Sequence, residues 1–259
     1  MDLGISGLTA IVCASSRGLG RGCAEALAQN GVNIVINGRD QKALEETSAY
    51  IKKKSKVEVT AVLADLCTLE GQKALLSACP NPDILINNNG GPPFRDYREI
   101  DRDEMIEGLV MNMITPIELI STVLDNMASR GFGRIVNITS LSVKMPMEGL
   151  DLSSGARAGL TAFIAGITPK FTKYNVTINN LLPGLFDTDR LKASTKRAAI
   201  KAGKSESEIA IERSSSIPAK RFGTAEEFGQ TCAFLCSIQA GYITGQNILI
   251  DGGRYPHTF

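Results

Sequence analysis

Short apolar runs alternate with longer amphipathic stretches along most of the chain. The short runs are rich in β-branched residues and are continuous rather than alternating, as in strands that are buried on both faces. Each is followed by a stretch of helical length, so we expect one α/β domain over residues 1–259, with a doubly wound parallel sheet of about seven strands. The expected strands are Leu8–Cys13, Asn33–Asn37, Val57–Leu63, Ile84–Asn87, Arg134–Thr139, Val176–Leu182 and Asn247–Ile250. The expected helices are Leu19–Asn30, Gln41–Lys54, Leu69–Cys79, Arg102–Arg130, Ser153–Lys173 and Ala225–Ser237.

One segment, Phe186–Phe222, departs from this rhythm. It is polar, rich in Lys, Ser and Ala, and has helical character around Arg197–Arg213. It lies between two expected strands at the carboxyl end of the sheet, where folds of this class bind ligands. We expect residues 186–222 to form a substrate lid within the domain; the alternative is a helical insertion without a role in binding.

Composition and charge exclude several classes of protein. The chain is 43% hydrophobic and 21% charged, with a formal net charge of +1, so no global charge draws it to nucleic acid or membrane. It lacks the stretch of about 18 to 20 uncharged apolar residues that a membrane helix needs. Its six cysteines form no CxxC pair, which favours small core residues over a metal site. We expect a cytoplasmic protein without metal, nucleic-acid or membrane partners.

A glycine-containing turn joins the first expected strand to the first helix. Its sequence is Cys13-Ala14-Ser15-Ser16-Arg17-Gly18-Leu19-Gly20. In such a turn the backbone approaches a pyrophosphate, whose charge is met by the helix N-terminus. We expect residues 14–20 to bind a dinucleotide; the alternative is a structural turn without ligand.

The motifs that follow, in their order, resemble the short-chain dehydrogenase/reductase family over residues 8–253. The glycine turn is similar to the family's TGxxxGxG fingerprint, with Ala14 in the place of the first glycine. We expect ordinary backbone angles there, because alanine disfavours positive φ. The resemblance, most general with 3-oxoacyl-[acyl-carrier-protein] reductases, implies a single-domain Rossmann fold with an active-site Asn112 and Ser140. It also implies cofactor contacts from Asp65, Leu66, Asn88, Asn89, Gly90, Pro183, Gly184 and Thr188.

The choice of cofactor rests on the end of the second strand. It reads Asn37-Gly38-Arg39, without the carboxylate that usually holds the ribose 2′-hydroxyl of NAD. Arg17 in the glycine turn can face the same point, and two guanidinium groups suit a 2′-phosphate. The sequence therefore predicts NADP(H) in preference to NAD(H); the alternative is a pair of solvated surface arginines.

The resemblance fails at the family's catalytic tyrosine and lysine. Counted from Ser140, these positions hold Ser153 and Arg157. Arg157 can donate to ribose hydroxyls but does not act as a proton shuttle, and the hydroxyl of Ser153 is a poor general acid near neutral pH. The candidate substitutes are Lys144, which we rank first, Asp151 and Tyr174.

Three functions stay open at this point. The first is an NADP(H)-dependent oxidoreductase for a carbonyl or hydroxyl substrate, with an atypical proton-transfer group. The second is a nucleotide-binding protein without redox activity. The third is a non-redox enzyme, because halohydrin dehalogenases resemble this family and use an arginine where Arg157 stands, although they lose the glycine fingerprint. A Ser–His–Asp hydrolase is excluded, because the one histidine is His257, near the C-terminal end.

The resemblance also implies a homotetramer. In the family the two long central helices, here Arg102–Arg130 and Ser153–Lys173, build a four-helix interface. Phe163, Ile167 and Phe171 recur at helical spacing and suit such a contact. The other expected partner is a small-molecule substrate, which Tyr97 can contact from its loop.

Overall fold

Seven parallel strands form one sheet in the order β3-β2-β1-β4-β5-β6-β7 in the computed structural model, which describes residues 1–256. The order reverses between β1 and β4, so a ligand crevice is expected outside the carboxyl ends of these strands. The strands are β1 (Thr9–Val12), β2 (Asn33–Gly38), β3 (Val59–Leu63), β4 (Ile84–Asn87), β5 (Gly133–Ile138), β6 (Val176–Pro183) and β7 (Asn247–Ile250). The predicted sheet is confirmed, with strand ends shifted by one or two residues.

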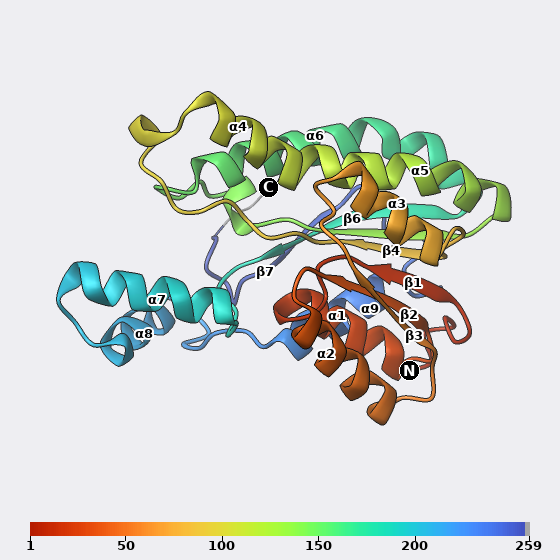
Figure 1. Cartoon of the computed structure of the whole chain (residues 1–259), viewed down its shortest axis with the longest axis horizontal. Coiled ribbons are helices and arrows are strands. Elements are labelled where there is room, and N and C mark those ends of the chain that lie inside the picture. The colour runs from red at the N-terminus through yellow and green to blue at the C-terminus, as the bar shows by residue number, and fades with distance from the viewer. Residues whose placement is uncertain (257–259) are drawn as a thin grey trace.

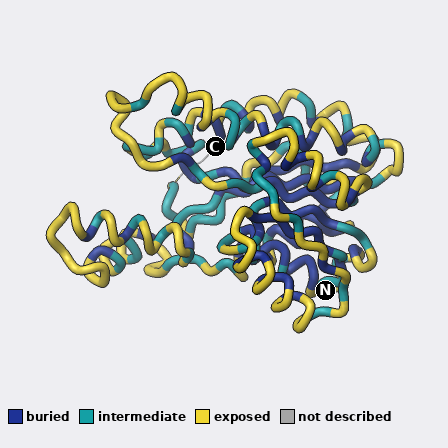
Figure 2. Tube along the Cα trace, in the orientation of Figure 1, coloured by how far each residue is buried: buried dark blue, intermediate teal, exposed yellow. Residues whose placement is uncertain are grey.

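Helices cover both faces of the sheet (Figure 1). Helices α1, α2 and α9 contribute to one apolar core cluster, and α3, α5 and α6 contribute to the other. Figure 2 shows that the strands are the most buried part of the molecule. The bounds of these helices are α1 (Gly18–Gln29), α2 (Gln41–Lys54), α3 (Leu69–Ala78), α5 (Thr115–Arg130), α6 (Asp151–Phe171) and α9 (Ala225–Leu235).

The helix expected over Arg102–Arg130 is interrupted. Helix α4 (Arg102–Leu109) is joined to α5 by a π-helical turn, Val110–Ile114, which carries Asn112. Such turns are rare in proteins overall, and those that occur are often found at functional sites. Among the described residues, this is the one helical segment long and apolar enough to cross a membrane by length and composition alone. Its α5 part contributes buried side chains to the core, so we interpret it as a core helix.

Two helices, α7 (Asp189–Ala202) and α8 (Glu206–Ser215), form most of the segment between β6 and α9. The helical character expected around Arg197–Arg213 is present, divided between two helices because Gly203 ends α7 with a φ of +65° and Ser205 caps α8. In Figure 1 the pair extends away from the sheet, and Figure 2 shows it to be mostly exposed. Its role as a lid stays a prediction.

Four asparagine side chains cross the sheet in one row. Asn87 donates to Asn137 (2.9 Å), Asn137 to Asn180 (3.0 Å) and Asn180 to Asn247 (2.8 Å). These residues are direct partners in the register of β4, β5, β6 and β7. A slip of one residue in any pair would break the row, so these side chains fix the strand register near the crevice.

Candidate active site

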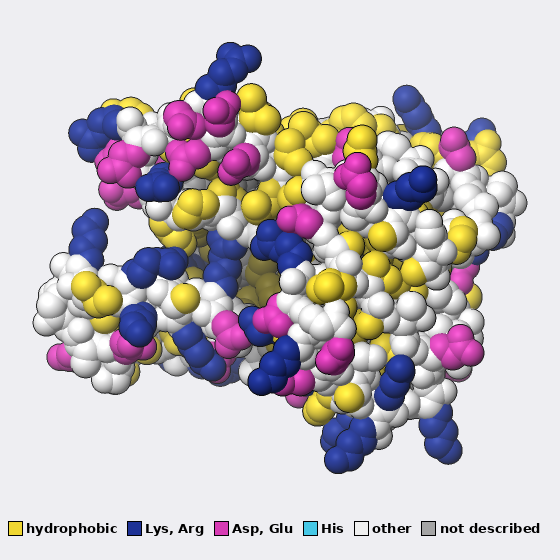
Figure 3. Space-filling model, viewed as in Figure 1, with side chains coloured by type: hydrophobic (Ala, Val, Ile, Leu, Met, Phe, Trp, Pro, Cys, Tyr) yellow, Lys and Arg dark blue, Asp and Glu magenta, His cyan; other side chains and the backbone are white. Residues whose placement is uncertain are grey.

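A cavity of about 580 Å³ opens at the carboxyl ends of the strands, beside the first turn of α7. Figure 3 shows a hollow on this side of the molecule, with Lys and Arg side chains in it. The predicted site residues that line the cavity are Ala14, Ser16, Arg17, Gly18, Leu19, Asn37, Arg39, Asp65, Leu66, Asn88, Asn89, Gly90, Ser140, Ser153, Arg157, Pro183, Gly184 and Thr188. Ser15 and Gly20 are buried behind this wall, Asn112 lines a small adjoining cavity, and Lys144 lines neither.

Ala14 adopts a left-handed backbone conformation with a φ of +43°, so the expectation of ordinary angles there is wrong. Its amide donates to Asn37 Oδ1 (3.2 Å), and its carbonyl accepts from Asn88 Nδ2 (3.0 Å). The next amide, of Ser15, donates to the Asn37 carbonyl (2.7 Å). A left-handed alanine costs about 1–2 kcal/mol, and these bonds hold it in place.

Gly20 lets helix α1 pack directly against this turn. A Cβ at Gly20 would lie 2.6 Å from the Ala14 carbonyl oxygen and 2.7 Å from Asn88 Nδ2. Helix α1 also begins without a side-chain cap and without an acidic residue in its first turn. Its first amides are therefore open to an anion, as a dinucleotide site requires.

At the β2 end of the cavity, each predicted phosphate-binding arginine has an acidic neighbour. Arg17 Nη2 lies 2.6 Å from Asp40 Oδ2, and Arg39 Nη1 lies 3.3 Å from Asp65 Oδ2. The four side chains are substantially exposed, so these pairs are weak. The Ala43 amide, assisted by Arg17, lowers the pKa of Asp40, which caps α2. Sequence analysis missed both pairs.

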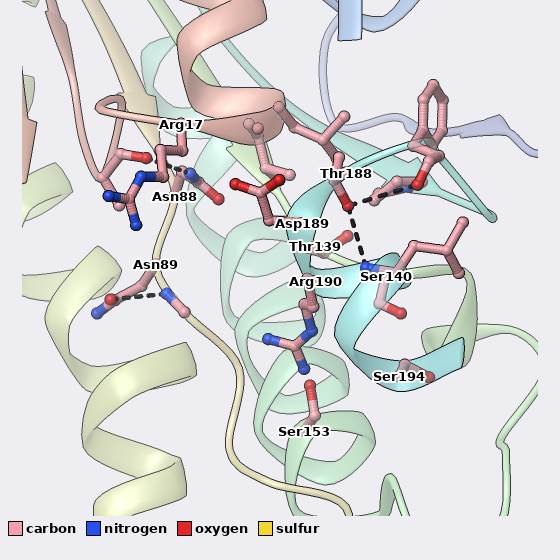
Figure 4. A pocket seen from close by; sticks show the side chains of 18 of the residues that line it. Arg17, Asn88, Asn89, Thr139, Ser140, Ser153, Thr188, Asp189, Arg190 and Ser194 are labelled. Atoms are coloured by element: carbon pink, nitrogen blue, oxygen red, sulfur yellow. Dashed lines mark hydrogen bonds between the residues drawn. The ribbon is translucent and has the colours of Figure 1, made fainter. Parts of the chain in front are cut away.

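Three predicted catalytic residues meet at the opposite end. Arg157 Nε donates to Ser153 Oγ (3.1 Å), one helical turn away on α6. Ser153 Oγ donates to Asn112 Oδ1 (3.3 Å), and Asn112 Nδ2 donates to the Gly90 carbonyl (2.8 Å). Ser140 reaches the same cavity from the end of β5, as Figure 4 shows. The π turn thus ties Asn112 to both the predicted catalytic helix and the cofactor loop.

The guanidinium of Arg157 is buried but only partly hydrogen-bonded. Besides its bond to Ser153, its Nη1 donates to the Ile138 carbonyl (2.7 Å). Within residues 1–256, its Nη2 has no hydrogen-bond partner and no carboxylate forms an ion pair with it. Burial, and then the charge of Arg190, lower the pKa of Arg157 to about 10. It is therefore a protonated cation near neutral pH, without a counterion among the described residues.

Four other candidates from the sequence do not line the cavity: Lys144, Asp151, Tyr174 and Tyr97. Lys144 follows the short helix η3 (Leu141–Val143) and is partly buried. Tyr174 lies beyond the far end of α6, and Tyr97 is 71% exposed. His257 lies outside the described residues.

Sequence analysis missed two arginines of the cavity wall, Arg190 and Arg254. Arg190 lies in the first turn of α7, directly after the Thr188 cap. Its guanidinium packs on Gly91, where a Cβ would lie 2.4 Å from Nη2. The sequence feature that could have identified Arg190 is its position two residues after Thr188, a predicted cofactor contact.

Comparisons with known proteins agree with this fold. Residues 13–254 match the family model described as enoyl-(acyl carrier protein) reductase. The chain is 32% identical over 254 residues to the NADPH-dependent reductase BacG of Bacillus subtilis, covering 95% of this chain and 96% of that protein. It is 29% identical over 255 residues to the 3-oxoacyl-[acyl-carrier-protein] reductase FabG of Haemophilus influenzae, covering 97% and 99%. The solved structure of L-sorbose reductase from Gluconobacter frateurii, complexed with NADPH and L-sorbose, matches with a TM-score of 0.93 at 28% identity, covering 99% and 100%.

Proposed function

Because the chain belongs to the short-chain dehydrogenase/reductase family, we propose that it is an NADP(H)-dependent oxidoreductase of a carbonyl or hydroxyl substrate. The observation that carries the proposal is one continuous cavity, lined by the glycine turn at one end and by Ser140, Ser153 and Arg157 at the other. The glycine turn and Asn88 to Gly90 would hold the dinucleotide, which supplies the hydride when bound. The tight fit at Gly20 and the uncapped start of α1 support this assignment.

The proposed cofactor is NADP(H) rather than NAD(H). A 2′-phosphate carries close to two negative charges and would compete well for Arg17 and Arg39, because their present ion pairs are exposed and weak. Asp40 is already engaged as the cap of α2, so releasing Arg17 leaves it hydrogen-bonded. The relative BacG and the L-sorbose reductase structure are described with NADPH, which supports the same choice.

In the proposed reaction, Ser140 and Ser153 donate hydrogen bonds to the substrate oxygen. Donation from Arg157 Nε polarises the Ser153 hydroxyl and makes it a better donor. The bond from Ser153 to Asn112 is long, at 3.3 Å, so it is readily exchanged for one to a substrate. Full proton transfer needs a more acidic group, and Lys144 stays our proposed donor, reaching the cavity by movement of the loop between η3 and α6.

Calorimetric titration of the purified protein with NADPH and NADH tests the cofactor. We expect tighter binding of NADPH and a loss of this preference in Arg39→Asp. Arg98→Asp is the matched control, because Arg98 forms an equally exposed pair with Asp96 and does not line the cavity. Equal affinities for the two cofactors, or an unchanged preference in Arg39→Asp, would contradict the NADP(H) assignment.

Oxidation of NADPH with a panel of ketones and aldehydes tests the reaction. We expect slow but measurable reduction, and a loss of at least about 100-fold in kcat/KM in Lys144→Ala if Lys144 supplies the proton. An unchanged rate in that variant would mean that a group other than Lys144 donates the proton. Tight NADPH binding without oxidation by any carbonyl would favour a nucleotide-binding protein without redox activity.

We also propose a cytoplasmic homotetramer assembled through α4, α5 and α6. Five large apolar side chains of this region are at least 40% exposed, and they are Met105, Ile106, Leu109, Ile114 and Phe163. Of the three residues expected in the interface, Phe163 fits, whereas Ile167 and Phe171 pack against the core. Light scattering at micromolar concentration tests this, and the single-chain mass of 27.7 kDa alone would contradict it.

A further inference from the structure

Positive charge is concentrated at the reacting end of the cavity. Arg157, Arg190 and Arg254 line the cavity; Arg197 is close enough to act on the pKa of Arg190, and Arg254 and Arg197 on that of Arg213. Within residues 1–256, none of these five arginines forms an ion pair with a carboxylate. Of the three described acids that line the cavity, Asp40 and Asp65 pair with Arg17 and Arg39, and Asp189 is exposed next to Arg190 without forming an ion pair with any described residue.

Arg190 lines the cavity from the first turn of α7 and is exposed. It comes from α7, yet its guanidinium lies against Gly91 in the loop after β4, where a Cβ would be 2.4 Å from Nη2 and 2.5 Å from Nη1. Figure 4 shows its guanidinium directed toward Ser153. No described residue accepts a hydrogen bond from it. Its donors therefore face the space where the substrate oxygen is proposed to lie.

The lowered pKa values of Arg190 and Arg157 also favour an anion at this cluster. Burial, and then the charge of Arg197, lower the pKa of Arg190, while burial and Arg190 lower that of Arg157. Like charges held together in a partly desolvated cleft repel one another unless an anion joins them.

A second buried arginine shows what a purely structural role looks like. Arg134 is 1% exposed, and its guanidinium donates to the carbonyls of Ser237, Gly133 and Asn175. Its donors are used by these carbonyls and by the Asn175 side chain. The donors of Arg190, which is exposed, and the Nη2 of Arg157 have no acceptor among the described residues, so they are available to a ligand in the cavity.

We propose that the substrate is an oxo acid, or the matching hydroxy acid, whose carboxylate binds between Arg190 and Arg157 while its reacting oxygen meets Ser140 and Ser153. The inference rests on the proposed oxidoreductase function. A guanidinium binds a carboxylate through paired, charge-assisted hydrogen bonds. Because Arg190 points at Ser153, the carboxylate lies only a few bonds from the reacting carbon, so the acid is small.

The test measures binding separately from turnover. The probes are pyruvate, 2-oxobutyrate, acetoacetate and laevulinate, each with its methyl ester, titrated into the protein saturated with NADP⁺. We expect at least one acid to bind, and its ester to bind at least about tenfold more weakly, as a lost charged hydrogen bond predicts. Arg190→Gln should weaken binding of that acid by about 10- to 100-fold and leave the ester unaffected. Arg190→Lys should restore part of the affinity.

Lys192→Gln is the matched control, because Lys192 is on the same helix and pairs with Asp187 at the surface. It should bind the acid as the wild type does. The other source of an anion at Arg190 is the pyrophosphate of the cofactor, so NADPH is titrated into the same variants. A loss of NADPH affinity in Arg190→Gln without an effect on the acids would overturn the proposal, as would equal binding of acid and ester or no binding of any acid. If the acids bind through Arg190 but no turnover occurs, the anion site stands and the oxidoreductase function fails.

Discussion

We propose that Ser153 and Arg157 stand where the family has its catalytic tyrosine and lysine, so that replacing them by tyrosine and lysine would restore this pair in the chain. The phenol hydroxyl would lie farther into the cavity than Ser153 Oγ, toward the substrate oxygen proposed for Ser140. Ser153 is only 5% exposed but lines the cavity, so the ring extends into the cavity toward Arg190 rather than into the core. The double variant therefore gains a group that can transfer a proton.

The size of the gain follows from acid–base catalysis. A positioned general acid contributes about 10²–10⁴-fold to a rate, or about 2.7–5.4 kcal/mol at 1.36 kcal/mol per tenfold. The change at Arg157 also removes its hydrogen bond to the Ile138 carbonyl (2.7 Å), which costs about 1–3 kcal/mol of stability. We expect a gain near the lower end, about 100-fold in kcat/KM, in a protein that unfolds more easily.

Initial rates of NADPH oxidation with a neutral ketone such as cyclohexanone measure this gain. The matched control is Ser153→Phe with Arg157→Lys, which adds the same ring without its hydroxyl and should stay slow. An equal gain in the phenylalanine control would refute the reasoning, because the ring and not the proton would then be responsible. A wild-type rate as high as that of the tyrosine variant would refute it as well.

Three further substitutions test the glycine turn and the asparagine row. Ala14→Gly should raise the free energy of unfolding by about 0.5–1 kcal/mol by relieving the positive φ, whereas Ala64→Gly, on the same cavity wall, should lower it; chemical denaturation measures both. Gly20→Ala should abolish NADPH binding in calorimetry, because its Cβ meets the Ala14 carbonyl at 2.6 Å; retained affinity would contradict the fit. Asn137→Leu should cost about 2–4 kcal/mol in the same denaturation assay, because Asn87 and Asn180 lose their partners; a cost below 1 kcal/mol would mean that the row adds little.

The sheet could be predicted from the sequence because strands buried on both faces appear as continuous apolar runs. The same pattern did not predict the asparagine row, because Asn137 and Asn180 lie inside runs that were interpreted as continuous apolar strands. The π turn was missed for a related reason. Val110–Ile114 is four apolar residues around one asparagine, and nothing in that pattern separates a π turn from an α-helical one.

The sequence could predict site residues whose conformation depends on their local sequence. It could not predict those whose conformation depends on contacts with distant segments. Ala14 was expected to avoid positive φ on its local preference, but Asn37 and Asn88 hold it there by hydrogen bonds. Arg190 appeared as one more cation in a polar segment. Only the tertiary contact with Gly91 shows that its guanidinium crosses to the reacting end of the cavity.

Ser153 and Arg190 also depend on each other. A serine leaves open the space that a tyrosine ring would fill, and Figure 4 shows the Arg190 guanidinium directed toward Ser153. The chain thus has a positive charge beside Ser153, and we propose that this charge binds an anionic substrate and stabilises negative charge on its reacting oxygen. In the Ser153→Tyr, Arg157→Lys variant, the ring displaces Arg190 and one of the two guanidinium groups is gone. We therefore expect the ratio of kcat/KM for an oxo acid to that for its methyl ester to fall by at least about tenfold. An unchanged ratio in this variant would mean that the two positions act independently.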